Sequence, residues 1–125
     1  MSDRKKILII DDEPRVVDAL CMILGDSGYD TAAAYTGREG LAQFDKQRCD
    51  VAVVDLKLPD MSGLDVLNRL RAEDSKISVI IITGHYTPQL TAEARSKGAF
   101  DVLAKPFSPA DILNMVRAAI DGGSG

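Results

Sequence analysis

Short apolar runs alternate along the chain with segments in which apolar residues recur at helical spacing. The runs occupy residues 7–10, 29–35, 51–54, 77–82 and 100–104. The second run, rich in alanine, is the weakest, and the others are nearly continuous in apolar residues. Runs in which polar residues do not alternate with apolar ones are typical of strands that are buried on both faces of a sheet. The pattern therefore predicts buried, parallel strands separated by helices.

The helical segments carry start and stop signals. Pro14 suits the first turn of a helix over residues 14–27, and Gly28 ends that helix. Thr36 and Glu39 have the spacing of a capping box at the start of the next helix. Three more helices are predicted around residues 64–70, over 87–98 and from 108 to 120. Five such units predict an α/β fold: a five-stranded parallel sheet, doubly wound in the flavodoxin-like (βα)5 manner, with helices on both faces.

Length and composition narrow the class of protein. The 125 residues fit one domain, expected over residues 1–121, with a flexible tail or linker remnant at 122–125. The net charge of −4 argues against direct nucleic-acid binding and against attachment to an anionic membrane surface. The chain shows neither a membrane-spanning run nor a signal peptide, and Cys21 and Cys49 lie in no metal-ligand or redox spacing. We therefore expect a cytoplasmic protein.

Polar side chains gather where the predicted strands end. Because the carboxyl ends of neighbouring parallel strands meet at one edge of a sheet, these side chains are expected to share a cleft. Two carboxylates about 4 Å apart repel by roughly 4 kcal/mol at an effective dielectric constant near 20. Clustered acids therefore raise their pKa values or recruit a cation. In chain order the strand ends carry Asp11-Asp12-Glu13, Asp55, Thr83 and Lys105.

This combination of groups suits an acyl phosphate. A few oxygen ligands favour Mg²⁺, which takes one or two carboxylates together with a phosphate and keeps several waters. The metal and Lys105 would neutralise an incoming phosphoryl group, and the Thr83 hydroxyl would donate to one of its oxygens. An aspartate in the same cleft could serve as the nucleophile.

The same stretches resemble four signatures of the response-regulator receiver domain of two-component signal transduction. Residues 55–63, Asp-Leu-Lys-Leu-Pro-Asp-Met-Ser-Gly, are similar to the family's pattern around its phosphorylated aspartate. Residues 10–14, Ile-Asp-Asp-Glu-Pro, resemble its acidic pocket. Thr83-Gly84 and Lys105-Pro106-Phe107 resemble the two remaining signatures. The four stand in the family's order, each at the end of a predicted strand, and the resemblance covers roughly residues 5–121.

The resemblance implies a role for each acidic-pocket residue. Asp55 would accept the phosphoryl group. Asp12 would bind Mg²⁺ directly, and Asp11 would act through a water molecule. The Asp55 carboxylate and the backbone carbonyl of Lys57 would complete the protein's contribution to the metal site.

The resemblance also implies a conformational switch. The sequence departs from the family's pattern at one position of that switch. After phosphorylation Thr83 would bind a phosphoryl oxygen and Lys105 would pair with the phosphoryl group, the Lys105–Pro106 bond being cis. The family usually has an aromatic residue three positions before this lysine, where this chain has Val102. An aromatic rotamer switch is therefore in doubt. Strand alternation predicts that Phe100 lies on the same side of the sheet as Val102.

The resulting functional prediction is a phosphorylation-controlled signalling switch rather than an enzyme. The resemblance implies a histidine kinase or phosphotransfer protein as donor, with self-catalysed transfer and autodephosphorylation. It also implies an altered surface over residues 87–120 that controls a partner or output domain, or that forms a homodimer. His85 stands where the family tunes access of the hydrolytic water, although a plain surface histidine is the alternative. Asp60 is expected to be a solvated charge.

Other functions stay open at this point. A receiver-like scaffold that works without phosphorylation is the main alternative, because Val102 departs from the family's pattern. A small Mg²⁺-dependent phosphohydrolase would need a second acid near the nucleophile, usually two residues on, where this chain has Lys57. A nucleotide-binding module would need a glycine- or hydroxyl-rich loop after the first strand, where this chain has three acids.

Overall fold

The computed structural model describes residues 4–122, within which strands and helices alternate strictly. The strands are β1 (Lys6–Ile10), β2 (Asp30–Ala34), β3 (Val51–Asp55), β4 (Ser78–Thr83) and β5 (Asp101–Ala104). The helices are α1 (Pro14–Asp26), α2 (Gly37–Lys46), α3 (Gly63–Glu73), α4 (Pro88–Ser96) and α5 (Pro109–Gly122). The predicted α/β fold is confirmed, and the element limits differ only slightly from those expected.

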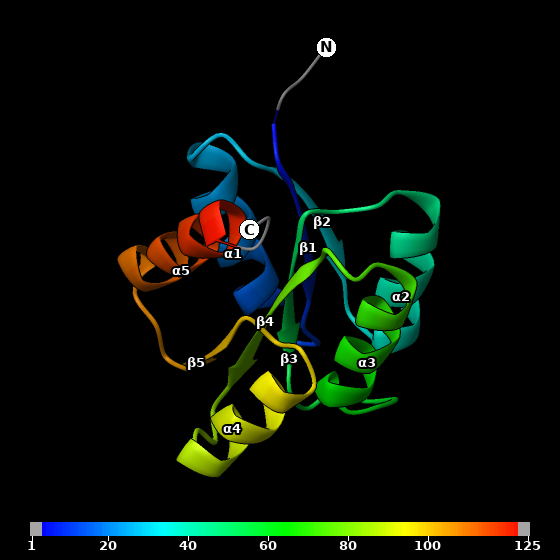
Figure 1. The fold of residues 1–125 in the computed structure, drawn as a ribbon. Coiled ribbons are helices and arrows are strands. Elements are labelled where there is room, and N and C mark those ends of the chain that lie inside the picture. The colour runs from blue at the N-terminus through cyan, green and yellow to red at the C-terminus, as the bar shows by residue number, and fades with distance from the viewer. Residues whose placement is uncertain (1–3, 123–125) are drawn as a thin grey trace.

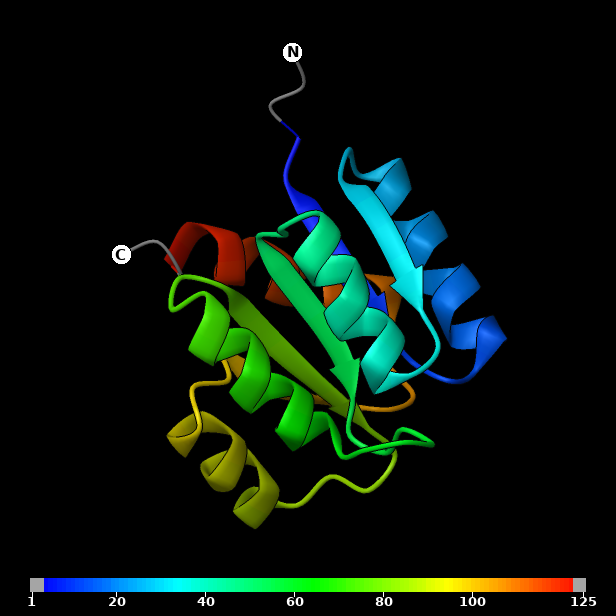
Figure 2. The ribbon, with the colours of Figure 1, turned by 90° about the vertical axis from the view of Figure 1, so that its right-hand side faces the viewer.

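One parallel sheet with strand order β2-β1-β3-β4-β5 forms the middle layer. Helices α1 and α5 cover one face, and α2, α3 and α4 cover the other (Figures 1 and 2). Every residue of β3 and β4 is buried, because these central strands pack against helices on both faces. This explains why their sequences are apolar almost throughout.

The sheet separates two hydrophobic cores. Beneath α2, α3 and α4 the core contains Phe44 and Leu67, both fully buried. Beneath α1 and α5 it contains Leu20, Leu24 and Val116, also fully buried. Burying one such side chain stabilises a fold by about 1.5–3 kcal/mol. The two cores therefore stabilise the sheet, whose edge carries the polar residues.

The helix starts follow the sequence signals. The Thr36 hydroxyl accepts a hydrogen bond from the backbone N–H of Glu39 at 3.0 Å and so caps α2. The Glu39 carboxylate accepts from the N–H of Tyr35 at 3.3 Å, one residue before the usual partner in a capping box. Gly28, with φ +95°, follows α1 in a backbone conformation that favours glycine.

Two details at the end of the chain differ from expectation. Helix α5 continues to Gly122, one residue into the predicted tail, and residues 123–125 of that tail lie outside the described residues. The predicted side for Phe100 is wrong, because Phe100 packs in the core of α1 and α5 whereas Val102 packs in the opposite core. Phe100 precedes the first residue of β5, so the alternation of the pleat does not extend to it.

No helix within residues 4–122 combines the length and the apolar character that crossing a membrane requires.

Candidate functional site: an acidic cleft at the carboxyl edge of the sheet

The sheet topology brings the predicted site residues together. Strand β3 lies between β1 and β4, and β5 follows β4, so the ends of four strands share one edge. The register pairs Asp55 with Ile82 and Thr83 with Ala104, which sets consecutive strand ends side by side. A cleft of about 390 Å³ at this edge is lined by Asp12, Glu13, Asp55, Lys57, Thr83, Gly84, His85 and Lys105.

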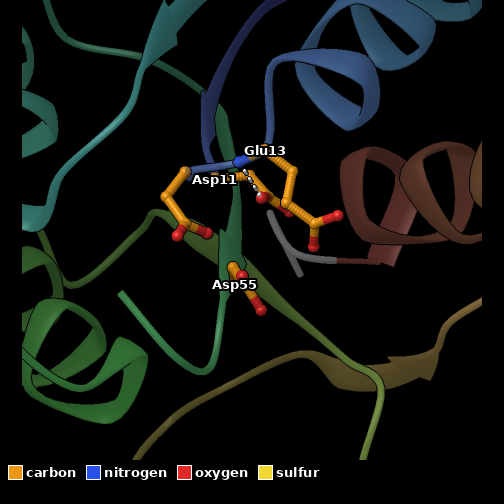
Figure 3. A group of neighbouring side chains, drawn as sticks. Asp11, Glu13 and Asp55 are labelled. Carbon is orange, nitrogen blue, oxygen red and sulfur yellow. Dashed lines mark hydrogen bonds between the residues drawn. The ribbon is translucent and has the colours of Figure 1, made fainter. Parts of the chain in front are cut away.

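Four carboxylates converge in and beneath this cleft. Asp11, Asp12, Glu13 and Asp55 each offer an oxygen, and these oxygens lie within 4.8 Å of one another. Asp11 is completely buried and Asp55 is 6% exposed, whereas Asp12 and Glu13 are exposed. The Glu13 N–H donates to Asp11 Oδ1 at 2.9 Å. Figure 3 shows this hydrogen bond after β1, with Asp55 at the end of β3. The sequence assigned no role to Glu13 beyond its place beside two aspartates.

One lysine is shared among three of these acids. Lys105 Nζ lies 2.9 Å from Asp11 Oδ2, 3.2 Å from Glu13 Oε1 and 3.5 Å from Asp55 Oδ2. Its side chain is largely buried, and the Lys105–Pro106 peptide bond is cis. The ammonium therefore compensates only part of the negative charge gathered here.

The pKa values reflect this imbalance. Burial raises the pKa of Asp55, and the charge of Asp11 raises it further, while Lys105 and the N–H of Lys57 lower it without cancelling the rise. Burial by itself would lower the pKa of Lys105, but the hydrogen bond and charge of Asp11, followed by the charge of Asp55, raise it overall. The lysine therefore stays protonated, and the site still favours a further cation.

The donor set fits a hard divalent cation. Every side-chain ligand in the cluster is a carboxylate oxygen, and the set contains neither a thiolate nor an imidazole. Oxygen ligands of this kind suit Mg²⁺ better than zinc or copper. The backbone carbonyl of Lys57 is the expected remaining ligand. Lys57 is exposed and lines the same cleft.

The loop after β3 closes tightly upon the predicted phosphoacceptor. The N–H of Gly63 donates to the Leu56 carbonyl at 2.7 Å, and Lys57 forms an isolated bridge with Ser62. A Cβ on Gly63 would lie 2.3 Å from the Asp55 carbonyl oxygen. Only glycine permits this approach, which gives a physical reason for Gly63 in the motif.

Thr83 ends β4 at the cleft with 1% of its surface exposed. Its hydroxyl oxygen accepts a hydrogen bond from the backbone N–H of His85 at 3.0 Å. The hydroxyl proton can therefore still be donated to a ligand in the cleft. His85 is exposed and lines the same cleft.

The remaining switch position, Val102, lies away from the acids. It is 5% exposed and packs in the core beneath α2, α3 and α4. Helix α4 packs against this core through Ala94, which is buried, and Leu90, which is partly buried. The structure thus brings Asp12, Asp55, Lys57, Thr83 and Lys105 to one cleft, with Asp11 buried beside them, and places Val102 in the core.

Sequence reasoning missed the contacts of Asp60. This residue is exposed, as expected of a solvated charge, but its carboxylate also accepts hydrogen bonds from the N–H groups of Gly37 and Arg38 at the start of α2. The partners lie 23 and 22 residues away in sequence, so no local pattern could have indicated them.

Comparison with known proteins agrees with this site. The sequence profile of the response regulator receiver domain matches residues 7–117. The transcriptional regulatory protein TrcR of Mycobacterium tuberculosis is 33% identical over 115 residues, which cover 92% of this chain and 45% of TrcR. The DNA-binding response regulator MtrA of Mycolicibacterium smegmatis is 34% identical over 117 residues, which cover 94% of this chain and 51% of MtrA. The chain thus spans about half the length of these curated relatives.

Solved structures agree as well. A CheY-like receiver domain protein from Methanospirillum hungatei has a TM-score of 0.92 at 30% identity, with 97% of both chains covered. The CheX–CheY–BeF3–Mg complex from Borrelia burgdorferi has a TM-score of 0.88 at 26% identity and covers 92% of this chain and 88% of that chain. The matched residues 7–117 include the whole acidic cleft, and the chain belongs to the response regulator receiver domain family of two-component signalling.

Proposed function

We propose that this chain is a phosphorylation-controlled switch that accepts a phosphoryl group on Asp55. The convergence of charges carries the proposal: four carboxylate oxygens lie within 4.8 Å of one another, and Lys105 Nζ lies 3.5 Å from Asp55 Oδ2. An isolated surface aspartate would gather neither the acids nor the ammonium. The same groups that crowd the resting carboxylate would stabilise a phosphoryl group once it is attached.

The donor is a phosphorylated histidine on a kinase or phosphotransfer protein. A carboxylate oxygen of Asp55 attacks the phosphorus, an O–P bond forms as the P–N bond breaks, and the departing imidazole takes a proton from solvent. Lys105 pairs with the phosphoryl oxygens, and the Thr83 hydroxyl donates to one of them. Attack of water on the acyl phosphate later releases inorganic phosphate and restores the carboxylate, so the chain catalyses its own reset rather than turning over a separate substrate.

The metal site is part of the same proposal. The carboxylates of Asp11, Asp12 and Asp55 and the backbone carbonyl of Lys57 would hold Mg²⁺, which when bound neutralises charge on the phosphoryl group. The raised pKa of Asp55, which burial and the nearby Asp11 produce, supports a need for this cation.

Phosphorylation adds a charge of about −1.5 to −2 beside Thr83. We infer that the change reaches a partner, an output domain or a second copy through the α4–β5–α5 surface. Because Val102 carries no ring, the change would begin at Thr83 and the segment before α4 rather than at an aromatic rotamer. The net charge of −4 supports a switch that makes no direct contact with nucleic acid, and we place it in the cytoplasm.

Intact-mass measurement tests the proposal. The chain is incubated with Mg²⁺ and phosphoramidate, with and without EDTA, and a single phosphoryl adduct is expected only when the metal is present. Asp55→Asn should abolish the adduct. Asp45→Asn, which removes an exposed carboxyl from α2, is the matched control and should leave it intact.

An adduct retained by Asp55→Asn would refute Asp55 as the acceptor. Absence of both the adduct and Mg²⁺ binding in the unchanged chain would favour the phosphorylation-independent scaffold. Turnover of small phosphoesters would instead favour a phosphohydrolase.

A further inference from the structure

We propose that Asp60 is a positioning residue for phosphoryl acceptance. It ties the tip of the acceptor loop, defined as residues 56–62, to the start of α2, and thereby holds the backbone that follows Asp55. This inference rests on the proposed function and adds to it a residue that lies outside the cleft.

Both carboxylate oxygens of Asp60 are engaged. Oδ1 accepts from the N–H of Gly37 at 2.8 Å, and Oδ2 accepts from the N–H of Arg38 at 2.9 Å. These donors belong to the first turn of α2, where backbone N–H groups lack partners within the helix and the helix dipole attracts an anion. The N–H of Arg38 lowers the pKa of Asp60, burial partly opposes this, and the N–H of Gly37 lowers the pKa further, so the carboxylate stays ionised at neutral pH.

The neighbouring Met61 reinforces the attachment. A Cβ added to Gly37 would lie 2.5 Å from Met61 Cγ and 2.7 Å from Met61 Sδ, so the methionine side chain rests directly on the backbone of α2. Asp60 and Met61 thus dock the loop tip on the first two residues of α2. Figure 2 shows the loop before α3 beside this end of α2.

The base of the acceptor loop is fixed independently. The Gly63 N–H to Leu56 carbonyl bond and the bridge between Lys57 and Ser62 close it against β3. Lys57 therefore belongs to this base, three residues before the docked Asp60. Its N–H lowers the pKa of Asp55 by hydrogen bonding to that carboxylate, and its carbonyl is the proposed metal ligand. Releasing the tip would let the peptide groups on either side of Lys57 reorient, which would disturb both functions.

A simple capping role is the competing explanation, and the chain offers a matched control for it. Thr36 caps the same helix by accepting from the N–H of Glu39 at 3.0 Å, a hydrogen bond that does not reach the acceptor loop. Thr36→Ala should weaken α2, as the loss of any cap does. Asp60, unlike Thr36, links the stability of this helix end to the geometry of the loop.

The test compares Asp60→Asn with Thr36→Ala in the full chain. Asparagine keeps the size of the side chain but offers one acceptor oxygen and an NH2 group that cannot accept the second N–H. We measure the Kd for Mg²⁺ by titration of amide chemical shifts and the rate of adduct formation with phosphoramidate. Asp60→Asn is expected to raise the Kd about tenfold, the lower end for groups that orient metal ligands, while Thr36→Ala changes it less than about twofold.

Hydrogen exchange provides a readout independent of phosphorylation. The Gly37 and Arg38 amides should exchange faster in both variants, whereas faster exchange at Lys57 should occur only in Asp60→Asn. Asp60→Ser, a second variant with a side chain too short to hold both amides, should lose at least as much Mg²⁺ affinity.

Unchanged Mg²⁺ affinity in Asp60→Asn, or an equal loss in Thr36→Ala, would overturn the inference while leaving the proposed function intact. Failure of the unchanged chain to bind Mg²⁺ would overturn both.

Discussion

Replacing Asp55 by asparagine should stabilise the metal-free domain at neutral pH, although it abolishes the acceptor. At an effective dielectric constant near 20, the attraction between Asp55 and Lys105 at 3.5 Å is worth about 5 kcal/mol. The repulsion from Asp11, whose oxygen lies within 4.8 Å, amounts to about 3.5 kcal/mol. Because these two contributions largely offset each other, the cost of burying the carboxylate decides the sign.

That cost has a definite pH dependence. Burial raises the pKa of folded Asp55 above its unfolded value, with the charge of Asp11 as the next cause. The protonated carboxyl therefore contributes stability that is fully present below the unfolded pKa, near 3.9, and is lost as the pH rises through the folded pKa. Asparagine does not titrate, so the advantage of Asp55→Asn should grow as the pH rises from 4 through the folded pKa of Asp55.

The measurement is urea unfolding followed by circular dichroism, in EDTA, at several pH values between 4 and 8. Asp45→Asn, at an exposed site on α2, serves as the control and should follow the unchanged chain. Saturating Mg²⁺ should reverse the order, because the unchanged chain keeps a ligand that the variant lacks. Parallel pH profiles for Asp55→Asn and the unchanged chain, or a variant that becomes relatively less stable as the pH rises, would refute the reasoning.

Three further substitutions probe the site and the cores. Gly63→Ala should destabilise the fold by about 1–3 kcal/mol, because its Cβ would meet the Asp55 carbonyl oxygen at 2.3 Å. Gly25→Ala, whose Cβ would have nothing within 4 Å, should be neutral or stabilising. Comparable urea midpoints for the two variants would contradict this steric explanation. Lys105→Met should raise the pKa of Asp55 and slow adduct formation at least about tenfold while tightening Mg²⁺ binding; an unchanged mass-spectrometric rate would count against its role. Phe44→Ala should cost about 3–5 kcal/mol, against less than about 0.5 kcal/mol for Met22→Ala, a residue that is 68% exposed, and equal shifts in thermal midpoint would contradict the assignment of the core.

The fold and the acidic cleft were predictable because each depends on a short-range pattern. Continuous apolar runs identify strands that are buried on both faces, and the position directly after such a strand places Asp11 and Asp55 at the same edge of the sheet. Parallel pairing of β1 with β3 then brings the two carboxylates together without further information.

What the sequence did not indicate depends on contacts between distant segments. Nothing near Asp60 identifies α2 as its partner, because the helix start lies 23 residues earlier in the chain. The side of Phe100 was predicted wrongly because periodicity was extended past the end of β5, where the chain leaves the pleat. The sharing of Lys105 between Asp11 and Glu13 likewise depends on side-chain geometry at the strand ends.

The division of the interior by the sheet has a consequence for how the chain can vary. The core under α1 and α5 and the core under α2, α3 and α4 contain different side chains, and the backbone of the sheet separates them. Free energies of substitutions on opposite faces should therefore add, whereas neighbours within one face should be coupled. Each core can drift in sequence without compensation from the other. The cleft is the exception, because it lies at the edge where both layers end. Substitutions from the two layers must be compatible with each other there.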